Sequence, residues 1–415
     1  MNLIKTSIYS GVSTVIRIIS SFVINKLIAI YIGPAGMAIM GNFQNFISIL
    51  SGLATGSINL GVVKYTAEYS KETKKLGSLF STSLRIIILC SALVSIICIA
   101  FSTFFSKRIL HSGNYSNLFI LFGVGVFLFS LNTIILSILN GKKEIRKFTI
   151  TNIVSSFVSF LLTGVLIYFQ RINGALLSLV LSQACIFFVA LYFLYQCEWF
   201  STSMLLGGLD KAVAKRLFRF SLMGITSTIV IPMSLLLIRN YISKQVSTGD
   251  AGYWEAINRI SSIYLMLITT SLSIYYLPKL SETHDTIEIR KEIGTAFKIV
   301  MPIVLFMSAC IFFLRFFIIR VVFSHQFGPM EPLFLFQLIG DNIKIASWLI
   351  AFLMLAKAMT KLYIITEVIF SATYFLLSIL FINKYGTVGA TYAYAINYTG
   401  YLITCYLVLR KRIGW

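Results

Sequence analysis

Long apolar stretches recur along the whole chain and are separated by short polar segments. Each stretch is about 20 residues long, which is the length that a helix needs to cross roughly 30 Å of hydrocarbon. The expected spans are residues 8–31, 39–63, 80–104, 117–139, 148–170, 173–195, 217–240, 253–277, 296–319, 332–356, 360–383 and 386–409. The pattern therefore predicts an all-α integral membrane protein with twelve transmembrane helices.

The second half of the chain repeats the first half at an offset of about 215 residues. At this offset Lys142 aligns with Lys357, and Gly174-Ala175 aligns with Gly389-Ala390. Because six spans per half is an even number, both halves enter the membrane in the same sense, with a pseudo-twofold axis along the membrane normal and a central cavity between them. The expected organisation is an N-lobe at 1–198, a cytoplasmic linker at 199–216 and a C-lobe at 217–415.

Composition agrees with a membrane protein, since 58% of the 415 residues are apolar, 12% are charged and the mean hydropathy is +0.88. The net charge of +21 would also fit a nucleic-acid-binding protein. The positions of the basic residues argue against nucleic-acid binding. About 20 lie in segments on the same side of the membrane as the N-terminus, and about 8 lie in segments on the opposite side. Arg239 is counted among the second group. This asymmetry is an orientation signal, and it places both termini in the cytoplasm.

The chain offers little for a metal site or a cofactor. Its six cysteines lie in or beside the spans without paired spacing, and its three histidines lie in loops far apart in the sequence. No soluble domain is inserted between the spans. We therefore expect no catalytic residues, no metal and no cofactor, apart from a proton or sodium ion that could drive transport.

Polar residues interrupt several spans in the first half. Arg17 lies near the middle of the first span within a stripe of serine and threonine residues. The second span contains Asn45 and Asn59 and ends at Lys64. A charge near the centre of a membrane helix is costly, and it typically faces a wet interior or a partner. Packing of small polar residues between helices is the alternative interpretation for the serines and threonines.

The second half carries a matching set of charged residues. They are Glu255 and Arg259 in the eighth span, Gln337, Asp341 and Lys344 in the tenth, and Glu367 in the eleventh. The spacings of Glu255 with Arg259 and of Asp341 with Lys344 allow ion pairs along each helix. A cavity lined by cations, amides and hydroxyls suits an anionic cargo that bears sugars.

Four segments resemble the Wzx family, the bacterial flippases of lipid-linked oligosaccharides in the polysaccharide-exporter branch of the MOP superfamily. These segments are Gly33-Pro34-Ala35-Gly36, the run from Gly61 to Tyr69, the run from Tyr276 to Ser281, and the run from Gln337 to Asp341. Their order and spacing carry the likeness, which extends from the first residues to the last. The charged stretch Glu255 to Arg259 departs from the family, so we expect those residues to serve a particular sugar.

The resemblance implies a MATE-like fold with a V-shaped cavity. It also implies transfer of an undecaprenyl-pyrophosphate-linked O-antigen or related repeat unit from the cytoplasmic to the periplasmic leaflet of the inner membrane. One chain would be sufficient for this transfer, and the O-antigen polymerase and the chain-length regulator are partners expected from the family.

On this interpretation the polar residues divide into three groups. The residues for pyrophosphate are Arg17, Arg259, Lys344 and Lys64, those for sugar are Asn45, Asn59 and Gln337, and the candidates for ion coupling are Asp341, Glu255 and Glu367. Two rivals remain. An exporter of cationic drugs would line its cavity mainly with acids, and a membrane polymerase or glycosyltransferase would need a large outer loop or a cytoplasmic carboxylate pair.

Overall fold

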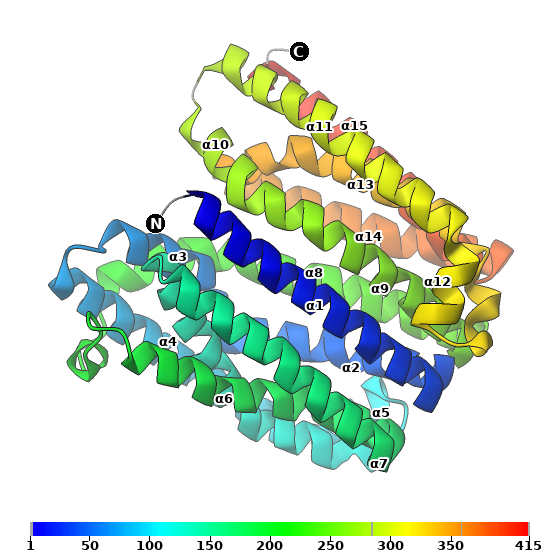
Figure 1. Ribbon diagram of the computed structural model, residues 1–415, viewed down its shortest axis with the longest axis horizontal. Coiled ribbons are helices and arrows are strands. Elements are labelled where there is room, and N and C mark those ends of the chain that lie inside the picture. The colour runs from blue at the N-terminus through cyan, green and yellow to red at the C-terminus, as the bar shows by residue number, and fades with distance from the viewer. Residues whose placement is uncertain (1–2, 284, 358, 414–415) are drawn as a thin grey trace. The chain divides into compact units, whose positions relative to one another are not determined.

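The computed structural model describes residues 3–283, 285–357 and 359–413, and these contain helices and turns but no strand (Figure 1). The apolar stretches form helices because a chain in lipid must satisfy its backbone hydrogen bonds internally. The longer helices are α1 (Leu3–Tyr31), α2 (Gly33–Ala54), α3 (Asn59–Glu68), α4 (Thr73–Ala100), α6 (Ser116–Gly141), α7 (Ile145–Tyr195), α8 (Lys211–Gln245), α9 (Thr248–Ser271), α11 (Thr286–Phe313), α13 (Leu333–Ala356), α14 (Thr360–Tyr385) and α15 (Val388–Ile413). Short helices α5 (Ser102–Ile109), α10 (Leu277–Glu282) and α12 (Arg315–Val322) lie between them. The predicted all-α class is confirmed.

Each of the twelve expected spans coincides with helix. The fifth and sixth both lie in α7, which is interrupted at Arg171, where φ is 51° and ψ is −125°. The second covers α2 and α3, which meet at a bend of 46°.

Length and apolarity alone select fewer spans. Among the described helices, eight are long and apolar enough to cross a membrane, or up to nine if α2 and α3 form one span. The 51 residues of α7 count as one helix in that number. Helices α9 and α15 do not meet this criterion of length and apolarity, and both are rich in polar and tyrosine residues. In a membrane helix such residues typically face the protein interior.

The two halves share local geometry as well as sequence. A Cβ added at Gly174 would lie 1.9 Å from the carbonyl oxygen of Leu166, and one added at Gly389 would lie 2.1 Å from that of Phe381. Both contacts join a residue to the one eight positions earlier, at the turn between the last two spans of each half. The internal repeat predicted from the sequence is therefore visible in the backbone.

The chain forms two compact units, and each is described by itself. The first unit comprises Met1–Tyr31 and Asn42–Pro232, and the second comprises Ile32–Gly41 and Met233–Trp415. The division thus passes through α2 and through α8, at Pro232. The lobe limits expected from the sequence stay a prediction.

Each unit has its own apolar core. In the first unit, α1 and α6 pack against α7, and α4 packs against α6. The buried residues there include Phe80 and Leu139. In the second unit, α13 and α14 pack against α15, and α9 and α11 pack against α13. The core of this unit surrounds Trp254 and Tyr394.

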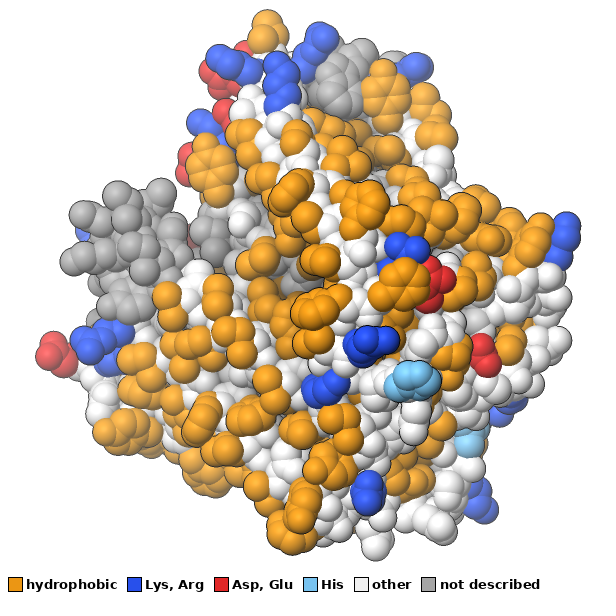
Figure 2. Space-filling view, turned by 45° about the vertical axis from the view of Figure 1, so that its right-hand side comes forward, with side chains coloured by type: hydrophobic (Ala, Val, Ile, Leu, Met, Phe, Trp, Pro, Cys, Tyr) orange, Lys and Arg blue, Asp and Glu red, His pale blue; other side chains and the backbone are white. Residues whose placement is uncertain are grey.

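Large apolar side chains also cover much of the outer surface (Figure 2). Phe313, Leu89 and Phe169 expose 77%, 74% and 74% of their surface. A water-soluble protein rarely exposes large contiguous apolar patches. The surface therefore fits a protein surrounded by lipid.

Candidate functional site

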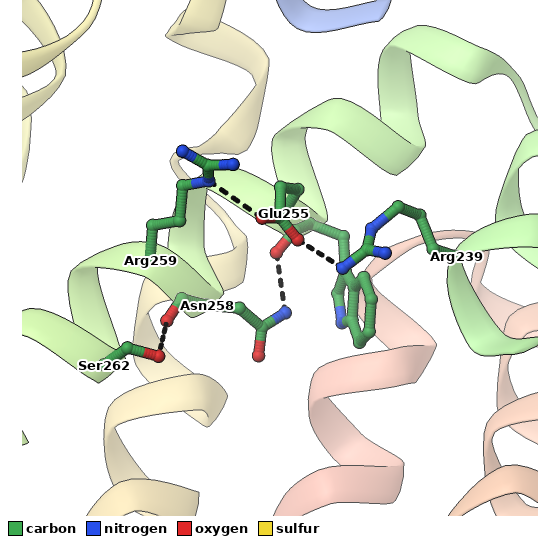
Figure 3. Close-up of polar contacts among 6 residues, drawn as sticks. Arg239, Glu255, Asn258, Arg259 and Ser262 are labelled. Atoms are coloured by element: carbon green, nitrogen blue, oxygen red, sulfur yellow. Dashed lines mark hydrogen bonds and ion pairs between the residues drawn. The ribbon is translucent and has the colours of Figure 1, made fainter. Parts of the chain in front are cut away.

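The second unit contains three charged side chains in contact, Arg239 from α8 and Glu255 and Arg259 from α9 (Figure 3). Oε2 of Glu255 accepts from Nη2 of Arg239, and Oε1 of Glu255 accepts from Nε of Arg259 at 2.8 Å. Two guanidinium groups therefore share one carboxylate, which leaves the group with a single net positive charge. We call these three residues the Glu255 cluster.

Burial is graded across the Glu255 cluster. The side chain of Arg239 is 2% exposed, that of Glu255 8% and that of Arg259 15%. Arg239 also lies over the indole ring of Trp254, 5.6 Å from its centroid, which is a cation–π contact. The amide of Asn258 donates to the carbonyl of Trp254 at 2.7 Å. Arg239 is thus the most enclosed member, and Arg259 is the most accessible.

The beginning of α2 packs tightly on this cluster. A Cβ added at Gly41 would lie 2.6 Å from Cδ of Glu255 and 2.9 Å from Cζ of Arg239. A Cβ added at Gly252 would lie 1.9 Å from the carbonyl oxygen of Pro34. Only residues without a side chain permit these distances, so the two glycines let α2 lie directly over the ion pair.

A second polar group surrounds Asp341 on α13, whose side chain is fully buried. It accepts hydrogen bonds from Oγ of Ser261 at 2.6 Å and from the hydroxyls of Tyr264 and Tyr394 at 2.9 Å each. Gln337 donates to Oγ of Ser261 at 3.2 Å. We call these five residues the Asp341 cluster. A buried carboxylate with several good donors is well accommodated even without a cation in contact.

Lys344 follows one turn after Asp341 but points to aromatic rings. Its ammonium nitrogen lies 5.0 Å from the ring centroid of Trp348 and 5.3 Å from that of Tyr398. The charges of Asp341 and Glu367 both act on Lys344. However, no ion pair joins Lys344 to either acid within the part of the chain that the structure describes.

The first unit holds the other candidate residues. Arg17 is exposed, and its Nη2 donates to Oδ1 of Asn152 at 3.4 Å. The exposed ammonium group of Lys64 lies 5.1 Å from the ring centroid of Phe220. Asn45 and Asn59 are half-buried, and each has one buried side-chain atom, Nδ2 and Oδ1 respectively, for which the described residues provide no hydrogen-bond partner. These atoms need a partner because burying an unpaired polar atom is costly.

One expected pairing was wrong, and one expected placement stays a prediction. Arg239, which was counted in an outer segment, is buried against Glu255 within α8, which continues to Gln245. The side of the membrane on which it lies stays a prediction. The i,i+3 pair of Asp341 with Lys344 does not form, because hydroxyl groups occupy the carboxylate. The i,i+4 pair of Glu255 with Arg259 does form.

The sequence analysis missed the hydroxyl donors Ser261, Tyr264 and Tyr394. Their signal was weak, because serine is common in membrane helices for packing alone and tyrosine is common at the membrane interfaces. Arg239 had a better signal, since the apolar pair Tyr241 and Ile242 follows it and extends the helix. The roles proposed for individual site residues stay predictions.

The comparisons with known proteins agree with this architecture. The chain is 29% identical over 415 residues to a lipid III flippase from Escherichia coli (strain K12). The alignment covers 99% of this chain and 100% of that protein. The inward-facing structure of a multidrug resistance MATE family transporter of the MOP superfamily is 14% identical, with a TM-score of 0.83, and the match covers 97% of this chain and 98% of that one. The inward closed structure of the lipid II flippase MurJ is 17% identical, with a TM-score of 0.73 and coverages of 99% and 89%.

These relatives confirm both the MOP-type fold and the resemblance to flippases that the sequence indicated. The family model described as "Polysaccharide biosynthesis protein" matches residues 3–284. Because that match covers more than half of this chain, the chain belongs to the polysaccharide biosynthesis protein family.

Proposed function

We propose that this chain is a flippase that moves lipid-linked oligosaccharides across the bacterial inner membrane. The observation that carries the proposal is the similarity over the whole length to a protein named lipid III flippase. Membership of a polysaccharide biosynthesis family and a fold shared with the lipid II flippase MurJ support it. The proposed role is transport and not catalysis.

The cargo that we propose is an undecaprenyl-pyrophosphate-linked O-antigen or related repeat unit, moved from the cytoplasmic to the periplasmic leaflet. Guanidinium groups match the oxygens of a phosphate in geometry and charge, so Arg17 and Arg259 would bind the pyrophosphate together with Lys344 and Lys64. The polyprenyl tail would stay in the bilayer, because transfer into a polar cavity has no driving force.

Sugar hydroxyls require amide or hydroxyl partners, and the candidates are Asn45, Asn59 and Gln337. The unpaired buried atoms of Asn45 and Asn59 support this assignment, because a bound sugar would supply the missing hydrogen bonds. We also propose that both termini are cytoplasmic and that one chain is sufficient for transport. Association with the polymerase and the chain-length regulator remains part of the proposal.

Asp341 is the better candidate for ion coupling among the buried acids. Both oxygens of Glu255 already bind guanidinium groups, whereas within the described residues Asp341 accepts hydrogen bonds only from hydroxyl groups. Uptake of a proton by Asp341 would disturb no ion pair. Glu367 is half-buried and stays a second candidate.

The test is the location of the lipid-linked intermediate in a strain that lacks this gene. We expect the undecaprenyl-pyrophosphate oligosaccharide to accumulate on the cytoplasmic face, out of reach of an impermeant probe, with loss of the surface polymer. Re-expression of the gene should restore both. Normal polymer and unchanged lipid pools would refute the proposal and would favour export of a drug or metabolite.

A further inference from the structure

We infer that Arg239 and Glu255 form a buried positioning pair that fixes the guanidinium group of Arg259 for the pyrophosphate of the cargo. The inference rests on the proposed function and adds the residues that prepare Arg259. Arg239 has no place in the groups assigned from the sequence, and Glu255 changes from a candidate for ion coupling to a structural partner of Arg259.

The difference in exposure between Arg239 and Arg259 indicates different roles for the two arginines. Arg239 is 2% exposed, pairs with Glu255 and lies over the ring of Trp254, so it is enclosed and a ligand cannot contact it while the cluster stays intact. Arg259 is 15% exposed and is the member that a ligand can approach. Arg239 therefore acts through Glu255, and only Arg259 would contact the cargo.

The contact geometry orients Arg259. Glu255 accepts from Nε of Arg259, so the carboxylate contacts the Nε side of that guanidinium (Figure 3). The terminal nitrogens form the edge that binds two phosphate oxygens at once. A side chain held at Nε loses less rotational freedom when this edge binds a ligand.

Arg239 also sets the net charge of the Glu255 cluster. Without it, Glu255 and Arg259 would make a neutral pair, and the carboxylate would repel an approaching anion at short range. With Arg239 on the other oxygen of Glu255, the cluster keeps one positive charge, which is carried on its most accessible member. The pair thus holds Arg259 without cancelling its attraction for phosphate.

The same contacts argue against ion coupling by Glu255. A proton on this carboxylate would weaken two charge-assisted hydrogen bonds and leave the guanidinium groups of Arg239 and Arg259 facing each other without their shared counter-charge. Gly41 adds a further constraint, because its close approach leaves the carboxylate no space to move toward α2.

The test measures binding of undecaprenyl pyrophosphate to the purified full-length protein in detergent, together with the midpoint of thermal unfolding. We expect Arg259→Gln to weaken binding about tenfold or more, because the group that contacts the phosphate is lost, and to lower the midpoint less than Arg239→Gln does, because Glu255 keeps its more deeply buried partner. Arg239→Gln and Glu255→Gln should weaken binding about as much, and they should also lower the midpoint because each leaves a buried charge with one partner fewer.

The double variant Arg239→Gln with Glu255→Gln separates positioning from stability. It restores one net positive charge and removes the unpaired buried groups, so the midpoint should return toward that of the wild type. Binding should stay weak, because a neutral amide holds the guanidinium of Arg259 less firmly than the carboxylate of Glu255 does. If binding recovers together with the midpoint, the pair is only structural and the inference is wrong. Arg108→Gln, at an exposed position on α5, is the matched control and should change neither quantity.

Gly41→Ala tests the same point without removing a charge. The added methyl group would meet Glu255 and Arg239 at 2.6 and 2.9 Å and should tilt the pair, which weakens binding. Gly294→Ala, where nothing lies within 4 Å of the new Cβ, is its control. Failure of the wild type to bind undecaprenyl pyrophosphate, or equal binding by wild type and Arg259→Gln, would overturn the inference. The deletion strain tests the flippase function independently.

Discussion

Arg171 and Gly386 adopt nearly the same left-handed backbone conformation at equivalent positions of the two halves. Their φ and ψ angles are 51° and −125° for Arg171 and 62° and −148° for Gly386. An L side chain rarely adopts such angles, whereas glycine does so without steric cost. Arg171 is held there by its own side chain, which donates to the carbonyl of Tyr31 at 3.4 Å and lies 5.5 Å from the centroid of that ring.

The first prediction concerns Gly386. Gly386→Ala should lower the free energy of unfolding by about 1–2 kcal/mol, because the left-handed conformation is retained while a Cβ is added. Gly294→Ala, in the middle of α11, should be neutral or slightly stabilising. The midpoint of thermal unfolding in detergent measures both changes, and equal midpoints for the two variants would contradict the prediction.

The second prediction concerns the Asp341 cluster. Tyr394→Phe removes one of three hydroxyl donors to a buried carboxylate and should cost about 1–3 kcal/mol of stability. Tyr385→Phe, on an exposed ring of α14, is the control and should have no effect. Comparison of the two midpoints of thermal unfolding gives the difference directly.

The third prediction follows from the assignment of Asp341 to ion coupling. Asp341→Asn should leave the protein folded, since an amide also accepts hydrogen bonds, but it should make flipping insensitive to a collapsed proton or sodium gradient. The sidedness of the lipid-linked oligosaccharide, measured with and without an ionophore, checks this. A variant that still responds to the ionophore as the wild type does would exclude Asp341 as the coupling acid.

The fourth prediction concerns Arg17. Arg17→Ala should reduce surface polysaccharide severalfold at low expression, because a cation that binds pyrophosphate is lost. Arg17→Lys should recover part of the loss, since it keeps the charge but not the planar guanidinium. Unchanged polymer in the alanine variant, at protein levels equal to those of the wild type, would show that Arg17 has no role in the transport step.

The fifth prediction concerns the linker before α8. Asp210 accepts from Oγ of Ser78 at 2.8 Å and from the backbone amide of Ala212 at 2.8 Å, so it caps α8 and ties the linker to α4. Asp210→Ala should therefore speed cleavage of residues 199–216 by an added protease. Glu198→Ala, at an exposed position close by, should not.

These contacts also set the pH dependence of the linker. The hydrogen bond from Ser78, followed by those from backbone amides, holds the pKa of Asp210 below its usual value of 3.8. A carboxylate whose pKa is lower in the folded state stabilises the fold above the unfolded pKa, and this contribution is lost as the pH falls through the folded pKa. Protease resistance of the linker should thus be constant near neutral pH and should decline only below about pH 4.

The sequence predicted the helices well because lipid imposes a strong pattern. Every backbone group in the bilayer must be paired within a helix, so each span appears as a long apolar stretch. The break at Arg171 separates two of the expected spans, although both belong to one element in the structure. The sequence predicted a span at 253–277 despite Glu255 and Arg259, and α9 is a helix there, although length and apolarity alone do not select it.

The site was predicted less completely because partners on different helices are not encoded in the spacing along one helix. Glu255 and Arg259 are four residues apart, and their pair could be foreseen. Arg239 pairs with Glu255 from another helix, and Tyr394 reaches Asp341 from a position 53 residues away. Such contacts depend on how the helices pack, which one sequence does not specify.

The division of the chain at Gly41 and at Pro232 bears on how the protein could have arisen. The sequence repeat points to duplication of an ancestral six-helix gene, yet the compact units do not end where the repeats do. The first turns of α2 belong to the second unit, where Gly41 contacts the Glu255 cluster. The first repeat thus supplies residues 32–41 to the second unit, and the second repeat supplies residues 217–232 to the first unit. Either repeat expressed alone would therefore lack a segment that the other provides to its compact unit.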